Sequence, residues 1–73
     1  MTDTQNPRSR TRRQRLTGAE LEMVELFAEG LTDLDIAAHF GRMTRAGVFD
    51  QFEEMLRKRK VGSRAELVED VLA

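Results

Sequence analysis

Hydrophobic residues follow a helical period from Leu16 onward, and capping residues mark where the first helix begins and ends. Thr17 and Glu20 have the spacing of a capping box, in which the hydroxyl accepts from the third helical N–H and the glutamate reaches back. Gly30 is a natural stop. The pattern predicts a helix over about 18–29, with an apolar face of Leu21, Val24 and Leu26 to Ala28.

A second, shorter helix is predicted over 33–40. Thr32 is its N-cap, and Asp33 and Asp35 lie in the first turn, where the helix dipole favours acidic side chains. Gly41 ends this helix. Its inward residues are Ile36, Ala37 and Phe40.

The rest of the pattern predicts two further helices. Thr44 caps a long third helix that ends in the basic run RKRK at 57–60, where cations oppose the helix dipole. Its inward residues recur at i, i+4, i+7 and i+8: Val48, Phe52, Met55 and Leu56. Ser63 and Glu66 predict another capping box, and the fourth helix carries Leu67, Val68, Val71 and Leu72.

These elements predict an all-α fold, with three helices around a small core and a fourth packed alongside. Valines are present, but they do not alternate with polar residues as a half-buried strand requires. The second helix, a short turn and the third helix have the lengths of a helix-turn-helix unit. We expect one domain over 16–73.

Charge separates the first fifteen residues from the rest. Residues 1–15 hold five arginines against Asp3, a balance of 5 − 1 = +4, whereas residues 16–73 hold seven basic against twelve acidic residues, 7 − 12 = −5. Residues 1–15 have no periodic apolar pattern and contain Pro7, so we expect a disordered basic arm. Such an arm either binds an anionic partner or is a solvated tail that aids solubility.

Composition argues against several other classes of function. The chain has no cysteine and one histidine, His39, too few ligands for a zinc site, and no catalytic or phosphate-loop motif or cofactor site is visible. No apolar run approaches the roughly 20 residues that span a bilayer, and no signal peptide is visible. We therefore expect a small cytoplasmic protein that is neither an enzyme nor membrane-bound.

Residues 16–40, LTGAELEMVELFAEGLTDLDIAAHF, are similar to the opening of LuxR-type (GerE-type) DNA-binding domains of bacterial transcription regulators. The matches continue through Thr44, Val48, Met55 and Lys58 to the VGSR segment at 61–64, so the resemblance covers about 16–73. It implies a four-helix LuxR-type helix-turn-helix domain, with the third helix as the DNA-reading helix. It also implies a homodimer formed through the last helix, where the apolar residues are Leu67, Val68, Val71 and Leu72.

The chain departs from this family where DNA would be read. The family usually shows Thr-Val-Lys-x-His in the third helix, and residues 47–51 here read GVFDQ. Ala19 replaces a usual arginine, and Arg59 stands where a core leucine is common. The turn before Thr44 must also hold one extra residue.

If the resemblance holds, double-stranded DNA is the partner. Arg45 can pair with a guanine, Arg42 can hold a phosphate, Phe49 can touch a thymine methyl, and Asp50 can accept from a cytosine amine. In the 57–60 cluster, Lys58 and Lys60 can grip flanking phosphates, and the arm can enter a minor groove or follow the phosphate backbone. The predicted DNA-binding residues are Arg42, Thr44, Arg45, Phe49, Gln51, Lys58, Lys60, Arg10, Arg12, Arg13 and Arg15.

The alternative is a protein-interaction module on the same scaffold. The outward side of the third helix carries Phe49, Asp50 and Glu53, an aromatic and acidic set that phosphates would repel. In this case the helix binds a transcription regulator or a subunit of the transcription machinery and no longer reads DNA. Phe49 is either an exposed contact residue or partly core, and the sequence leaves both open.

Overall fold

In the computed structural model, residues 14–73 are described, and this part of the chain is all-α. Its four helices are α2 (Gly18–Ala28), α3 (Asp33–Phe40), α4 (Arg45–Arg59) and α5 (Arg64–Leu72), and it contains no strand. The predicted fold class and the four predicted helices are confirmed. Most of the predicted arm, with Arg10, Arg12 and Arg13, lies outside the described residues.

Each helix begins at the predicted cap. The side chains of Thr17, Thr32, Thr44 and Ser63 each accept from the N–H of the third helical residue, over 3.0 to 3.2 Å. Around Thr17 and Thr32 the reciprocal bond is also made, so both are full capping boxes. The predicted box at Ser63 is only half right, because Glu66 reaches one residue further back and accepts from the N–H of Gly62 at 2.6 Å.

Two glycines and a lysine end the first three of these helices. Gly30 and Gly41 follow α2 and α3 with φ of 102° and 82°, a backbone conformation that side chains with a Cβ disfavour. Lys60 closes α4 with φ of 58°, and its N–H donates to carbonyls of the last turn. The glycine stops are confirmed, and the chain turns back after α4 without one.

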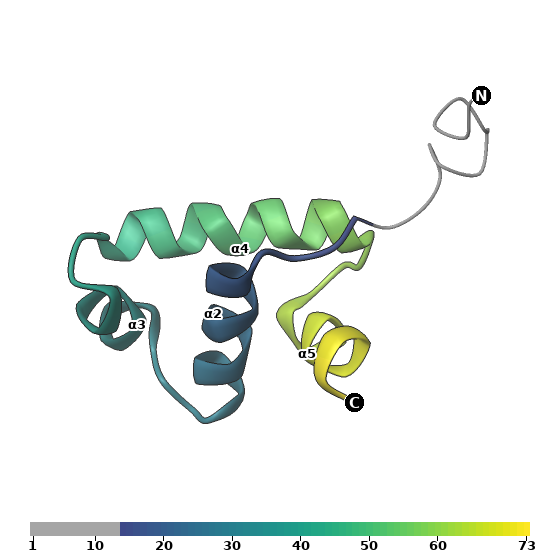
Figure 1. Ribbon diagram of the computed structural model, residues 1–73, viewed down its shortest axis with the longest axis horizontal. Coiled ribbons are helices and arrows are strands. Elements are labelled where there is room, and N and C mark those ends of the chain that lie inside the picture. The colour runs from purple at the N-terminus through teal and green to yellow at the C-terminus, as the bar shows by residue number, and fades with distance from the viewer. Residues whose placement is uncertain (1–13) are drawn as a thin grey trace.

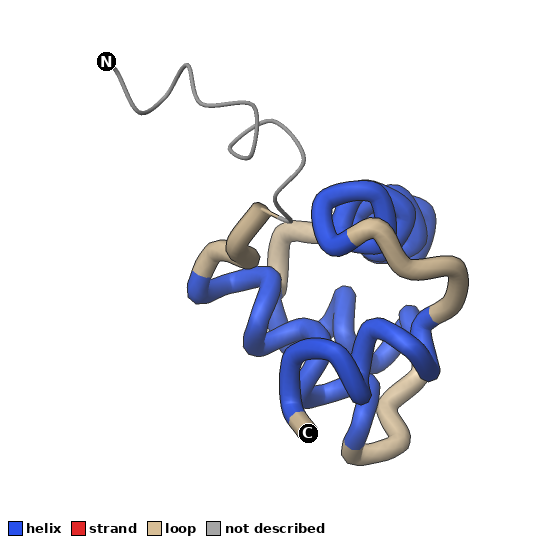
Figure 2. The backbone as a smooth tube through the Cα atoms, turned by 90° about the vertical axis from the view of Figure 1, so that its right-hand side faces the viewer, coloured by secondary structure: helices blue, strands red, loops and turns tan. Residues whose placement is uncertain are grey.

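Helix α4 lies along one side of the molecule, and α2, α3 and α5 all lie on its other side (Figure 1). Figure 2 views α4 nearly end-on and shows the same separation. One face of α4 is therefore buried and the other is open along the whole helix. No helix within residues 14–73 has both the length and the apolarity that a bilayer crossing needs.

The core lies between α4 and the other three helices. It consists of Met23, Val24, Ile36, Ala37, Val48, Phe52, Met55 and Leu67, all buried. The predicted inward residues of α4 are confirmed, with Leu56 packed half-buried at the edge. On α2 the prediction of Leu21 as inward is wrong: Glu20, Met23, Val24 and Phe27 share the inward side, so Leu21 is turned to solvent.

Candidate nucleic-acid interface

The open face of α4 is acidic at its centre. Ala46, Asp50, Glu53 and Arg57 recur at i, i+4, i+7 and i+11 opposite the buried residues, and all four are exposed. Arg57 is the only cation of this stripe, and it donates to Glu54 on the same helix. The middle of α4 therefore offers hydrogen-bond acceptors rather than positive charge.

Two arginines flank the start of α4. Arg42, in the turn, and Arg45, the first helical residue, are exposed and make no ion pair within residues 14–73. Between them, the Thr44 oxygen accepts from the N–H of Gly47 at 3.0 Å, which leaves its hydroxyl hydrogen able to donate to a phosphate. These three predicted DNA-binding residues are brought together at the positive end of the helix dipole.

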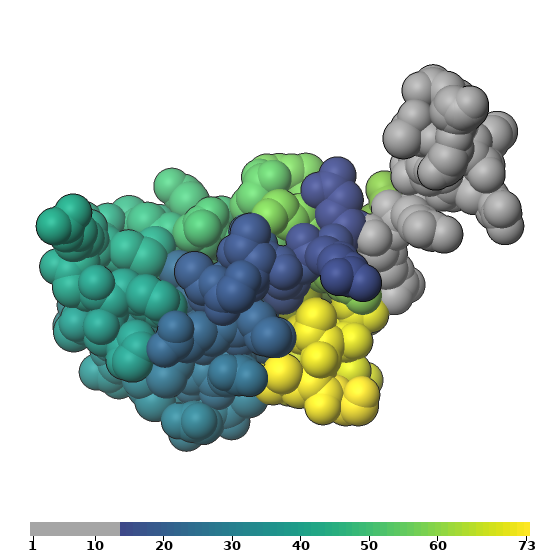
Figure 3. Space-filling view, viewed as in Figure 1, coloured from purple at the N-terminus to yellow at the C-terminus, as the bar shows by residue number. Residues whose placement is uncertain are grey.

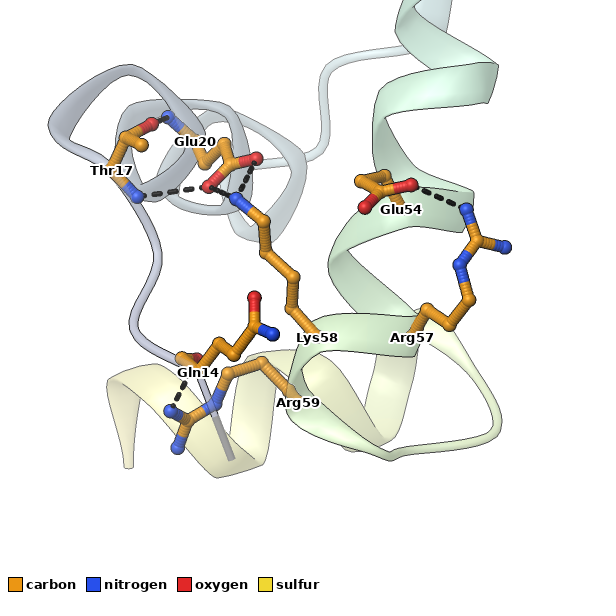
Figure 4. Close-up of polar contacts among 7 residues, drawn as sticks. All are labelled: Gln14, Thr17, Glu20, Glu54, Arg57, Lys58 and Arg59. Atoms are coloured by element: carbon orange, nitrogen blue, oxygen red, sulfur yellow. Dashed lines mark hydrogen bonds and ion pairs between the residues drawn. The ribbon is translucent and has the colours of Figure 1, made fainter. Parts of the chain in front are cut away.

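At the other end of α4, Lys58 is committed to an internal ion pair. Its Nζ donates to both carboxylate oxygens of Glu20, at 2.7 and 2.8 Å, and the two side chains are only 20% and 6% exposed (Figure 4). The backbone N–H of Thr17 also donates to Glu20, at 2.9 Å. The predicted phosphate contact of Lys58 would compete with this pair, because a phosphate that took Lys58 would strip a buried carboxylate of its cation.

The Glu20 carboxyl is held ionised by these partners. Burial raises the pKa of Glu20, but the hydrogen bond from Lys58, the N–H of Thr17 and the charge of Lys58 outweigh it and leave the pKa below the ordinary value of 4.5. The same carboxylate thus completes the cap of α2 and joins α2 to α4. Sequence reasoning found the cap but not the ion pair.

Arg59 joins three parts of the chain, which explains why a leucine is not needed at this position. Its Nε donates to Asp70 of α5 at 2.6 Å, and its Nη1 donates to the carbonyl of Gln14 at 3.0 Å. The N–H of Gln14 in turn donates to the carbonyl of Lys58 at 3.0 Å. Sequence reasoning missed this contact, and the only signal was the unusual arginine.

Contacts with the rest of the domain extend back to Gln14, two residues before the predicted domain start at residue 16. Gln14 is fixed to the end of α4, and Thr17 is fixed through Glu20, so residues 14–17 form a strap across that end (Figures 3 and 4). Arg15 lies within this strap, exposed and without an ion pair inside residues 14–73. It belongs to the body of the domain rather than to a free arm.

A polar hollow of about 250 Å³ opens beside the strap, lined by Gln14, Glu54, Arg57, Lys58 and Lys60. Lys60 is exposed and makes no ion pair within the described part of the chain. The Arg57 side chain is 71% exposed, so its pair with Glu54 is a solvated surface contact. The Lys60 side chain is therefore available to a ligand, and its predicted phosphate contact stays a prediction.

Phe49 lies on the flank of α4, between the core and the open face. It is 51% exposed, and the guanidinium of Arg64 lies 5.9 Å from its ring centre. Arg64 lies closer to Phe52, at 4.0 Å, and donates to both carboxylate oxygens of Asp33 at 2.6 and 3.0 Å. Arg64 therefore partly covers the Phe49 ring, and the ring is only in part an exposed apolar contact residue.

Arg64 also controls the charge state of Asp33. Its hydrogen bonds lower the pKa of Asp33, burial opposes them, and the charges of Arg64 and Arg45 add to the lowering. The ion pair ties the start of α3 to the start of α5. Sequence reasoning did not predict this ion pair; Arg64 was noted only as part of the VGSR segment that matches the family.

Gln51 is half-buried beside the core stripe, because it lies three residues after Val48 and four before Met55, so only part of its side chain is open to DNA and the predicted contact stays a prediction. The predicted interface set of α5 needs correction. On α5, Leu67 is fully buried, so it cannot serve a dimer interface. Val68 and Val71 pack half-buried on the core, and Leu72 is the exposed apolar residue of α5.

Within residues 14–73, the basic side chains without an ion pair are Arg15, Arg42, Arg45 and Lys60. All of them lie at one end of α4 or the other, and the remaining basic side chains neutralise carboxylates. In the described part of the chain, basic side chains without an ion pair thus lie only at the two ends of one exposed helix. Comparison of the chain with protein-family models, curated proteins and solved structures found no match.

Proposed function

We propose that this chain is a DNA-binding transcription regulator of the LuxR-type helix-turn-helix class, acting on nucleoid DNA in the cytoplasm. The observation that carries the proposal is the placement of Arg42 and Arg45, unpaired, at the start of an exposed helix that follows α3 after a short turn. This is the end of a recognition helix that meets base edges and phosphates. A basic side chain that makes no ion pair within residues 14–73 is available to DNA in that place.

The charge pattern of α4 sets how such a complex would be built. Duplex DNA carries one negative charge per roughly 1.7 Å, so the acids at the centre of α4 oppose binding wherever they approach phosphates. Asp50 can be accommodated over the groove floor, where a cytosine amine donates to an acceptor. Affinity therefore comes from phosphate contacts, and base reading is confined to the few groups of α4 that match donors.

The surface available for dimerisation through α5 is small. Because Leu67 is buried, two copies would have to meet through Leu72 and the outer side of Val68. We propose this small apolar surface as the dimer contact on DNA, where two half-sites hold the copies close together. The DNA-binding proposal itself needs one copy only.

Replacing both arginines, Arg42→Gln with Arg45→Gln, is expected to weaken binding to a labelled duplex roughly 60-fold at about 0.1 M salt. Each phosphate contact adds about 0.9 to the slope of log K against log salt, so two contacts account for about 1.8. Fluorescence anisotropy of the full chain over a series of salt concentrations measures both the affinity and the slope.

The matched control is Ala28→Glu with Ala73→Glu, which lowers the net charge by the same two units. These exposed residues lie at the ends of α2 and α5 away from α4 (Figure 1). We expect the control to change the slope far less than the arginine variant. Equal slopes for the original chain and the arginine variant would overturn the proposed role of the helix start.

A second candidate is the protein-interaction module, and the open face of α4 favours it. Asp50 and Glu53 are exposed there, and the half-exposed ring of Phe49 lies beside them. An acidic face with an aromatic flank matches a basic, partly apolar protein surface such as one on a regulator or a transcription-machinery subunit. A folded full chain that binds no duplex at low salt would support this candidate over DNA binding.

A further inference from the structure

The end of α4 beside the strap (residues 14–17) is held by several tertiary contacts and carries several basic side chains. Adjacent residues of α4, Lys58 and Arg59, hold the two ends of the strap, Thr17 through Glu20 and Gln14 directly. Asp70 of α5 accepts a hydrogen bond from Arg59. The strap is therefore fixed at both of its ends to the end of α4 (Figure 4).

We propose that this end of α4 is a second phosphate-binding surface, in which Arg15, Arg57 and Lys60 bind the nucleic-acid backbone beside the hollow. The inference rests on the proposed DNA binding and extends it from the start of α4 to its end. Gln14 at this end of α4 directly follows a stretch of the sequence with four arginines in residues 1–13.

Local charge favours a phosphate here. Among the residues that line the hollow, Arg57 and Lys60 stand against one acid, Glu54, and Lys58 is neutralised by Glu20. Arg15 lies in the adjacent strap, and the pair of Glu54 with Arg57 is solvated and weak. The negative end of the helix dipole opposes an anion, by about half a charge. That field is blunted, because N–H groups of Gln14, Lys60 and Val61 already donate to carbonyls of the last turn of α4.

The length of α4 allows both ends to touch one duplex. Its 15 residues rise about 1.5 Å each, so the helix spans roughly 22 Å, and the major groove is about 12 Å wide. When the start of α4 meets one phosphate backbone and the helix crosses the groove, its end lies over the other backbone. A double-stranded partner therefore fits the two separated cationic ends and the acidic centre between them.

The test removes the unpaired cations at this end by Arg15→Gln with Lys60→Gln in the full chain, bound to a labelled duplex over a salt series. Neither side chain takes part in an ion pair within residues 14–73, so the strap stays intact. We expect the salt slope to fall by about 1.8, as for loss of two contacts. An unchanged slope, in a variant that unfolds at the original temperature, would overturn the proposal.

The variant Glu54→Gln provides a test of opposite sign. It removes the acid that competes with a phosphate for Arg57 at the hollow, so we expect binding to tighten several-fold and the salt slope to steepen. A slope that stays at the original value would contradict the proposal. If the slope responds to changes at Arg42 and Arg45 but not at this end, only the second surface fails; if the original chain does not bind, the proposed function fails.

Discussion

Lys58→Met is expected to cost the domain most of its stability. The substitution leaves Glu20, 6% exposed, without the cation that neutralises it. Breaking a buried ion pair by removing one partner costs about 3 kcal/mol or more, and a core of this size rarely supplies more than about 3–5 kcal/mol. We expect the variant to be largely unfolded at pH 7, as measured by far-UV circular dichroism during urea titration.

The opposite substitution, Glu20→Gln, is the control and should cost less. Lys58 is 20% exposed and can turn its ammonium group to water, whereas Glu20 has no such route. Glutamine also keeps an oxygen that can accept from Thr17. If the two variants lose equal stability, or if Lys58→Met unfolds at the original urea concentration, the ion pair does not hold α2 to α4.

Acidification adds a second signature to the same pair. Because Lys58 and Thr17 hold the pKa of Glu20 below 4.5 in the fold, the pair stabilises the original chain above that pH and loses its effect as the pH falls through the folded pKa. In Lys58→Met burial raises the pKa instead, so protonation relieves the penalty. We expect the gap in unfolding free energy between the two chains to narrow as the pH falls, first above pH 4.5 as Glu20 is protonated in the variant and then below pH 4.5 as it is protonated in the original chain.

The two phenylalanines of α4 are expected to respond very differently to alanine. Phe52 is fully buried, lies 5.5 Å from the ring of Phe27 and stacks under Arg64, so Phe52→Ala should cost about 3–5 kcal/mol. Phe49 is 51% exposed with one cation contact, so Phe49→Ala should cost under about 1 kcal/mol. Urea midpoints of both variants measure the difference. Similar losses would mean that α4 presents a different face to the core.

The helix starts and the all-α class could be predicted because they depend on residues a few positions apart. Thr17, Thr32 and Thr44 cap the helices that follow them, and the bond involved spans three residues. The buried stripe of α4 was likewise visible as a repeat in the sequence, and Val48 and Phe52 are both fully buried. Local chemistry decides such features.

The candidate site was harder to predict, because it depends on which cations the fold has already used. Lys58 and Lys60 are two residues apart in one basic run, yet Lys58 neutralises a carboxylate 38 positions away and Lys60 has no such partner within residues 14–73. The N–H of Gln14 donates to the carbonyl of a residue 44 positions later, at the end of α4, and no local sequence pattern predicts such a contact. The sequence shows how many charged residues there are, but tertiary contacts decide which of them are already paired.

Salt dependence of duplex binding by the full chain tests most directly whether the free cations at both ends of α4 contact DNA. If Arg15, Arg42, Arg45 and Lys60 each meet one phosphate, the slope of log K against log salt is at least about 3.6 in magnitude, from four contacts at about 0.9 each. Contacts made by Arg57 and by residues 1–13 would steepen it. A slope of this size supports the account; no binding at low salt, or a slope near zero, contradicts it.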